Sequence, residues 1–264
     1  MNEDKAARAE IESAIGRYRW FQSFEIVPGM TSPGMFPVQP ARFLDDLGVG
    51  TDLTRQTTLD VGCMEGAVAF ELEQRGAASH AVDIHDPDEI AFNMVKRLRG
   101  SSVIYRRGSV YDVGAIFPGL RFDLIVFKGV YYHLRNPVGA LEALAAVTAP
   151  AGRLIIAGEC LISFAVDLQG KTWDPDLVRR LAESDLPVSV CYPGSIVGHP
   201  SSTWFVPNVA CLKGWLQATG WELERYTLHE VPNAQPRPGQ RFIGIARRAG
   251  PPAPVEHPIF NWRS

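Results

Sequence analysis

Two glycines and two acids are spaced along one stretch of the chain in a pattern that could bind a ligand. Residues 57–66 read TTLDVGCMEG. Within them a short apolar run holds Asp60 and meets Gly62 and Gly66, and a helical pattern follows. Glycine lets the backbone turn sharply and approach a ligand, because a Cβ there would clash. A second apolar run ends in Asp83, and an acid about 20 residues past such a turn can accept hydrogen bonds from ribose hydroxyls. The spacing therefore predicts a nucleoside-binding unit.

The glycine spacing distinguishes between nucleoside ligands. Gly62-x-x-x-Gly66 is not the dinucleotide fingerprint GxGxxG. The pattern that starts at Asp60 resembles motif I of class I S-adenosylmethionine-dependent methyltransferases, with Met64 in place of the middle glycine. The resemblance implies that Asp60 orients the turn beside the methionine moiety, that both glycines admit the donor and that Asp83 binds its ribose. In the alternative reading, the turn and the acid only close a strand–helix–strand unit.

The same resemblance implies further donor contacts from residues that follow the predicted strands. In methyltransferases the residues after the third strand border the adenine, which assigns Ser109 and Val110 to that place. Lys128 is expected to line the donor pocket, and Tyr132 to contact the donor or the acceptor. The candidate cofactor-binding set is completed by Cys63 in the turn and by Ile84 beside the ribose acid.

Two residues are candidates for the general base. Methyl transfer from a sulfonium is an in-line displacement, and an alcohol acceptor must also lose a proton. His133, just past the fourth predicted strand, is the first candidate, because imidazole titrates near neutral pH. The alternative is a histidine that braces its loop by hydrogen bonds. Glu159, at the end of the fifth predicted strand, is the second candidate, as a base or as an anchor for acceptor hydroxyls. The remaining His and Asp residues show no ligand spacing, so we expect no metal site.

These residues need a parallel sheet to bring them together. Apolar runs alternate with helical patterns, and the fourth strand is apolar throughout, as expected for a strand buried on both faces. We predict an α/β fold with a doubly wound, seven-stranded, Rossmann-like methyltransferase sheet, an N-terminal helical lid and an insertion after the fifth strand. Helices are expected over 42–53 and from Pro87 onward. The predicted strands lie at 59–61, 81–83, 103–105, 122–127, 153–159, 221–224 and 241–246.

Composition changes along the chain predict its organisation. An N-terminal helix and an aromatic, proline-rich segment precede the core and are read either as a lid or as ordinary packing. A turn-rich stretch after the fifth strand is the natural place for acceptor selection. The predicted units are the N-terminal helix and lid (1–53), the donor-binding core (54–159), the acceptor-side insertion (160–207), the last helix and two strands of the core (208–249) and a tail (250–264).

Length, charge and cysteine content exclude several classes of protein. The 264 residues, 46% of them hydrophobic, suffice for one full core. No apolar run is long enough to span a membrane, and the charged N-terminus has no secretory apolar region. Four scattered cysteines favour free thiols and a cytoplasmic location. A net charge of −3 counts mildly against nucleic acid as the main partner, although a local basic patch could still bind it. The expected partner is a small-molecule acceptor, and a homo-oligomer is left open.

Two longer stretches narrow the family. FDLIVFKGVYYHLRNPVGALEAL (122–144) and TWFVPNVACLKGWLQATGWE (203–222) resemble the tRNA wobble-uridine carboxymethyltransferase family and its relatives known only as methyltransferases. Members that use carboxy-S-adenosylmethionine hold its extra carboxylate with a lysine, a tyrosine and an arginine. The tyrosine matches Tyr132, the lysine segment here reads TSPGMF without a cation, and the arginine-bearing C-terminal block has no counterpart. Because an unpaired buried carboxylate is costly, plain S-adenosyl-L-methionine is the predicted donor.

The leading hypothesis is an S-adenosylmethionine-dependent methyltransferase that acts on a small polar acceptor. O-methylation of a sugar or a secondary metabolite is the reaction we expect. A modifier of the tRNA wobble uridine is one alternative. A protein that keeps the cofactor fold without catalysis is another.

Overall fold

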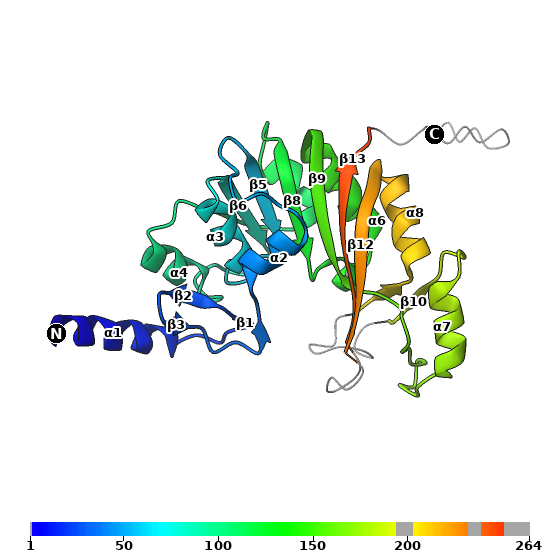
Figure 1. Ribbon diagram of the computed structural model, residues 1–264, viewed down its shortest axis with the longest axis horizontal. Coiled ribbons are helices and arrows are strands. Elements are labelled where there is room, and N and C mark those ends of the chain that lie inside the picture. The colour runs from blue at the N-terminus through cyan, green and yellow to red at the C-terminus, as the bar shows by residue number, and fades with distance from the viewer. Residues whose placement is uncertain (1, 194–202, 232–238, 251–264) are drawn as a thin grey trace.

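The chain folds around a central seven-stranded sheet that lies between two layers of helices (Figure 1). The computed structural model describes residues 2–193, 203–231 and 239–250. The strand order is β12-β13-β9-β8-β5-β6-β7, in which β13 runs antiparallel to both its neighbours and the strands from β5 to β9 are parallel. The predicted doubly wound sheet is thereby confirmed. Its strands are β5 (Thr57–Val61), β6 (Ala78–Asp83), β7 (Ile104–Arg107), β8 (Phe122–Lys128), β9 (Thr148–Glu159), β12 (Trp221–Val231) and β13 (Gly239–Arg248).

Alternate residues of the central strands enter different cores, because successive side chains of a strand point to opposite faces. In β8, Leu124 and Val126 pack on one face, whereas Ile125 and Phe127 pack on the other. The first face is covered by α2 (Pro40–Asp46), α3 (Ala67–Gln74) and α4 (Phe92–Arg99). The second is covered by α5 (Val113–Ile116), α6 (Pro137–Val147) and α8 (Val209–Ala218).

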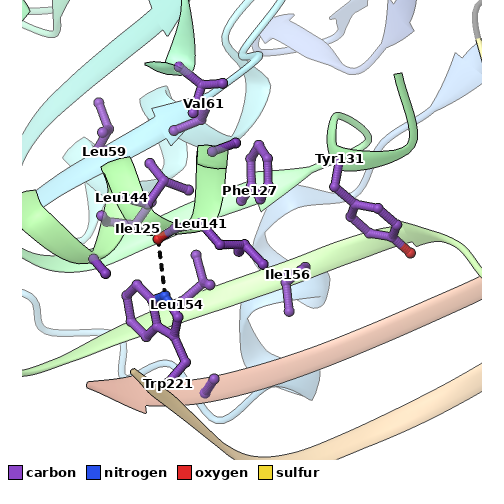
Figure 2. Packing of buried hydrophobic residues seen from close by; sticks show 14 of the residues in the cluster. Leu59, Val61, Ile125, Phe127, Tyr131, Leu141, Leu144, Leu154, Ile156 and Trp221 are labelled. Atoms are coloured by element: carbon purple, nitrogen blue, oxygen red, sulfur yellow. Dashed lines mark hydrogen bonds between the residues drawn. The ribbon is translucent and has the colours of Figure 1, made fainter. Parts of the chain in front are cut away.

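The second core also ties the antiparallel end of the sheet to a helix. Trp221 opens β12 and is buried, and its indole N–H donates to the carbonyl oxygen of Leu141 in α6 at 3.3 Å (Figure 2). A buried indole N–H without a partner would cost stability, so this bond lets a large side chain fill the core.

Several element boundaries differ from those predicted, and three of the differences lie beside residues with a positive φ. The helix expected over 42–53 is α2 and ends at Asp46, because Gly48 adopts φ +63° and turns the chain. The helix expected from Pro87 is α4 and begins only at Phe92, after Ala91 at φ +60°. Strand β9 begins at Thr148 rather than Arg153, and a register irregularity between β8 and β9 absorbs Ala151 at φ +62°.

The N-terminal segment packs against the first helical layer. Helix α1 (Asn2–Ile15) projects from the body (Figure 1), and the chain then forms β1 (Gln22–Ser23), β2 (Glu25–Val27), β3 (Met30–Thr31) and β4 (Phe36–Pro37). Trp20, Phe24 and Ile26 are buried in a cluster shared with α3 and α4. Of the two readings of this segment, the structure displays packing; a role as a lid stays a prediction.

The segment after β9 forms a small cluster of its own. It contains α7 (Pro175–Glu183) and the antiparallel pair of β10 (Ser189–Cys191) and β11 (Phe205–Pro207). Leu161, Val178 and Val206 are among its buried residues. Parts of the predicted insertion (194–202), of the loop between the last strands (232–238) and of the tail (251–264) lie outside the described residues. Within the described part, none of the helices has the length and apolar character needed to cross a membrane.

Candidate active site

The turn that follows β5 requires glycine at two positions. Gly62 has φ +71° and Gly66 φ +90°, which L-residues with a Cβ rarely adopt. A Cβ on Gly62 would lie 2.3 Å from Cγ2 of Val130, and one on Gly66 would lie 2.6 Å from the ring of Phe92. Both glycines therefore let neighbouring side chains pack directly against the turn and let its backbone adopt a left-handed conformation.

Asp83 ends β6, the parallel neighbour of β5, and its carboxylate lies against the same turn. The side chain is buried. Oδ2 accepts the backbone N–H of Met64 at 2.9 Å, and Oδ1 lies 3.1 Å from the backbone nitrogen of His85 and 2.6 Å from its Nδ1. The structure thus brings the glycine turn and the predicted ribose acid together, because the carboxyl ends of adjacent parallel strands lie at the same edge of the sheet.

This corner of the sheet fits an adenosyl donor. The turn carries no side chain at Gly62 or Gly66. The buried carboxylate of Asp83, which already has three nitrogen neighbours, keeps about one of its roughly four lone-pair sites for a hydroxyl group. Ile84, the next residue, is 63% exposed, which offers an apolar surface beside the ribose acid. A large exposed aliphatic side chain at the end of a buried strand is the kind of surface on which an adenine ring can pack.

Three other predicted donor residues are engaged in structural contacts. Oγ of Ser109 accepts the backbone N–H of Tyr111 at 3.3 Å and caps the short helix η1 (Val110–Asp112). Val110 is buried in the core. Cys63 is buried too, so a donor contact from this residue would come from its backbone. Their roles at the donor stay predictions.

Asp60 and Lys128 interact electrostatically near the carboxyl ends of β5 and β8. Asp60 is buried, and its Oδ2 accepts the backbone N–H of Ala69 in α3 at 3.1 Å. Burial raises the pKa of Asp60 to about 7, against the opposing effect of the Lys128 cation. Burial also lowers the pKa of Lys128, whose Nζ lies 5.7 Å from the centroid of the Phe43 ring. Lys128 and Asp60 are thus electrostatically coupled, and the expected place of Lys128 along the donor pocket stays a prediction.

Replacing Asp60 by asparagine is expected to change how stability depends on pH. Because the folded protein raises this pKa above its unfolded value of 3.8, the stability that the protonated carboxyl contributes is present below pH 4 and is lost as the pH rises through about 7. Asparagine resembles the protonated form. We therefore expect Asp60→Asn to be more stable than the wild type at pH 8, by a few kcal/mol at roughly 1.4 kcal/mol per pKa unit, and similar to it near pH 4. Urea unfolding of both proteins at several pH values measures the difference, and a difference independent of pH would contradict the assignment.

A second group of candidate residues gathers where β8 and β9 end. The short helix η2 (Tyr131–His133) follows β8. Tyr131 is fully buried and extends across β9 (Figure 2), and its hydroxyl donates to the carbonyl oxygen of Glu159 at 2.5 Å. The rings of Tyr132 and His133 are 4.1 Å apart between centroids. The structure thus places His133, Tyr132 and Glu159 in one group.

An arginine that the sequence reading did not expect completes this group. Arg241, on β13, forms an ion pair with Oε1 of the buried Glu159, and its Cζ lies 5.9 Å from the centroid of the Tyr132 ring. Burial would lower the pKa of Arg241, but Glu159 outweighs it and the pKa is raised. Although the family's arginine-bearing C-terminal block could not be aligned with this sequence, Arg241 places a guanidinium beside Tyr132. The antiparallel register pairs Arg241 with Glu159, and the sequence alone did not reveal that register.

A second residue that the sequence reading passed over is Glu65, inside the glycine turn. Its side chain is fully buried and accepts hydrogen bonds from the backbone of the N-terminal segment. The sequence could have pointed to Glu65 by residue type alone. A charged residue between the two glycines of the turn needs a partner once it is buried.

No metal site or disulfide is assigned. Among the described residues, no group of three or more His, Cys, Asp or Glu side chains could hold a metal ion. All four cysteines are free thiols, and Cys63, Cys160 and Cys211 are buried.

The strand order and the site define a class of protein: a class I S-adenosylmethionine-dependent methyltransferase. The chain belongs to the methyltransferase domain family, whose sequence model matches residues 37–225. That match runs from β4 into β12 and includes the glycine turn, Asp83, η2 and Glu159, but not Arg241. S-adenosyl-L-methionine is accordingly the methyl donor of the class.

Relatives of known name cover part of the chain. A tRNA U34 carboxymethyltransferase of Helicobacter pylori is 27% identical over 177 residues, which are 65% of this chain and 58% of that protein. The protein of the same name from Klebsiella pneumoniae is 30% identical over 176 residues, or 65% of this chain and 45% of the relative. The chain thus spans about half the length of these relatives.

Solved structures share the fold at lower identity. The N-terminal domain of EvdMO1, solved in the presence of S-adenosylhomocysteine and D-fucose, is 20% identical with a TM-score of 0.60, over 92% of this chain and 97% of that one. The 1,6-didemethyltoxoflavin-N1-methyltransferase of Burkholderia thailandensis is 17% identical with a TM-score of 0.54, over 80% and 76%.

Proposed function

We propose that this protein transfers a methyl group from S-adenosyl-L-methionine to a hydroxyl oxygen of a small polar acceptor, such as a sugar or a secondary metabolite. The observation that carries the proposal is the ion pair of Glu159 and Arg241 beside Tyr132. The pair offers a carboxylate acceptor and guanidinium donors, which suit neighbouring hydroxyl groups. Support comes from EvdMO1, whose N-terminal domain was solved with a sugar and aligns with nearly the whole chain. The four free thiols favour action in the cytoplasm.

The geometry at the strand ends supports the following roles. Asp83 would accept a hydrogen bond from a ribose hydroxyl, and the backbone of the Gly62–Gly66 turn would hold the amino-acid end of the donor. The bound donor supplies an electrophilic methyl group on a sulfonium, so this chain has mainly to align the acceptor oxygen with it. His133 would accept the hydroxyl proton while the oxygen–carbon bond forms and the carbon–sulfur bond breaks. Glu159 would orient the acceptor.

Replacing His133 separates its two candidate roles. If His133 is the base, both His133→Ala and His133→Gln should lower kcat about 100-fold and leave donor affinity unchanged. If it only braces η2, glutamine can keep a hydrogen bond and should retain most of the activity. Steady-state kinetics with the acceptor in excess, and calorimetry with S-adenosylhomocysteine, make the comparison. Activity in the glutamine variant would remove His133 from the catalytic set.

The ion pair also bears on which form of the donor is used. Arg241 could attract an extra carboxylate on the donor, but Glu159 already neutralises it and would repel a second carboxylate. We therefore expect calorimetry to show plain S-adenosylmethionine binding at least about tenfold more tightly than the carboxy form. Glu159→Gln releases Arg241 and should narrow that difference. Tighter binding of the carboxy form by the wild type would overturn this part of the proposal.

The rival function is modification of the tRNA wobble uridine. It is favoured by the names of the relatives that are 27% and 30% identical to the chain. Against it stand the net charge of −3 and the paired state of Arg241. Incubation with methyl-labelled donor, separately with bulk tRNA and with a panel of sugars and hydroxylated metabolites, distinguishes the two. Label in tRNA, with salt-sensitive tRNA binding, would replace the proposal.

A further inference from the structure

Glu65 is a buried acid with an unusual set of partners. It lies in the glycine turn between Met64 and Gly66, and its side chain is fully buried. Oε1 accepts the backbone N–H of Phe21 at 2.5 Å, and Oε2 accepts that of Gln22 at 3.2 Å. Among the described residues, no lysine, arginine or histidine is within ion-pair distance of it. The carboxylate is therefore compensated by two amides from a segment more than 40 residues upstream.

A second bond joins the same two parts of the chain. Oε1 of the Gln22 side chain accepts the backbone N–H of Ala67, the first residue of α3, at 3.3 Å. Gln22 is itself held in place, because Gly34 packs so closely that a Cβ there would lie 2.1 Å from the carbonyl carbon of Gln22. The ring of Phe21 lies 4.6 Å from that of Phe36 between centroids. Residues 20–38, the N-terminal cap, thus meet the turn at Phe21 and Gln22.

The turn connects this cap to the ribose acid through adjacent residues. The backbone N–H of Met64 donates to Asp83, and the side chain of the next residue, Glu65, accepts from the cap. A ligand that fixes Met64 through Asp83 also restricts Glu65, because the two residues share a peptide bond. Conversely, a seated cap fixes the turn before a ligand arrives.

We propose that Glu65 is a positioning residue that couples donor binding to the seating of the N-terminal cap on the glycine turn. The proposal rests on the donor site given above. Without the carboxylate, two buried amides lose their acceptor, so the cap should loosen and the turn should lose part of its preorganisation. The cap would then be an ordered part of the donor site and not only a layer packed beside it.

Hydrogen–deuterium exchange of the full chain, with and without S-adenosylhomocysteine, tests the coupling. In the wild type we expect the ligand to slow exchange both at residues 62–67 and at Phe21 and Gln22. In Glu65→Gln one oxygen remains, but the amide NH₂ faces the second backbone N–H. We therefore expect exchange at Phe21 and Gln22 to be about tenfold faster without ligand, little affected by ligand, and the dissociation constant for S-adenosylhomocysteine to rise about tenfold.

Two further variants serve as a control and as an independent test of the coupling. Glu73→Gln is the matched control. Glu73, on α3, likewise accepts a backbone N–H, but from Ser102 on another loop, so this variant should change neither readout. Gln22→Met removes the bond from Ala67 to the Gln22 side chain without changing a residue of the turn. It should also speed exchange at Phe21, and it serves as the test if Glu65→Gln fails to fold. Ligand protection of residues 62–67 with no change at Phe21 would overturn the coupling alone. Absence of protection at 62–67 in the wild type would overturn the donor site and the coupling together.

Discussion

Replacing Asp83 by alanine is expected to remove measurable binding of S-adenosylhomocysteine. The carboxylate is buried and would accept a hydrogen bond from a ribose hydroxyl at its remaining lone pair, and such a charge-assisted bond contributes roughly 1.5–3 kcal/mol. The change also leaves the N–H of Met64 without its acceptor, so the turn itself is disturbed. Together these losses predict an affinity at least about 100-fold weaker by calorimetry.

Two variants show whether the effect belongs to this carboxylate. Asp83→Asn keeps the size of the side chain and one oxygen, so we expect it to lose less affinity than alanine. Asp112→Asn changes an exposed acid at the end of η1 and should leave binding unchanged. If Asp83→Ala bound the ligand as tightly as the wild type, the adenosyl group could not lie at this corner of the sheet.

The second large effect is expected from Gly62→Ala. A Cβ at this position would sit 2.3 Å from Val130, and the backbone would keep a φ of +71° that alanine disfavours by roughly 1 kcal/mol. Relief of the overlap requires Val130 to move, at a further cost of about 1–3 kcal/mol. Because Val130 directly precedes η2, we expect the variant to lose both donor affinity and turnover, with a lower Tm.

Gly100→Ala is the matched control for backbone strain. Gly100 has φ +59° at the end of α4, and a Cβ there would meet nothing within 4 Å. It should cost only the roughly 1 kcal/mol of left-handed backbone and leave donor binding intact. Thermal unfolding and donor-binding calorimetry on both variants separate the cost of the left-handed backbone from the cost of the overlap with Val130. Equal effects would mean that contact with Val130 is unimportant.

The amino-acid sequence by itself determined the alternation of strands and helices and the place of the glycine turn. The apolar runs that end in Val61, Asp83 and Phe127 are local patterns, and burial on both faces of a parallel sheet leaves few other ways to use them. Once those strands are parallel and adjacent, their carboxyl ends must share one edge. Helix ends were less certain, because Gly48 and Ala91 take left-handed conformations that residue type alone does not require.

Only the tertiary structure decided which partner each buried charged side chain has. Arg241 reaches Glu159 through the register of β13 on β9, and Glu65 finds its amides in a segment 44 residues earlier. Neither contact follows from spacing along the chain, because each depends on how whole strands and loops are placed by burial of apolar side chains elsewhere. A buried charge must have a partner, but the sequence does not say which partner; packing brings that partner to it.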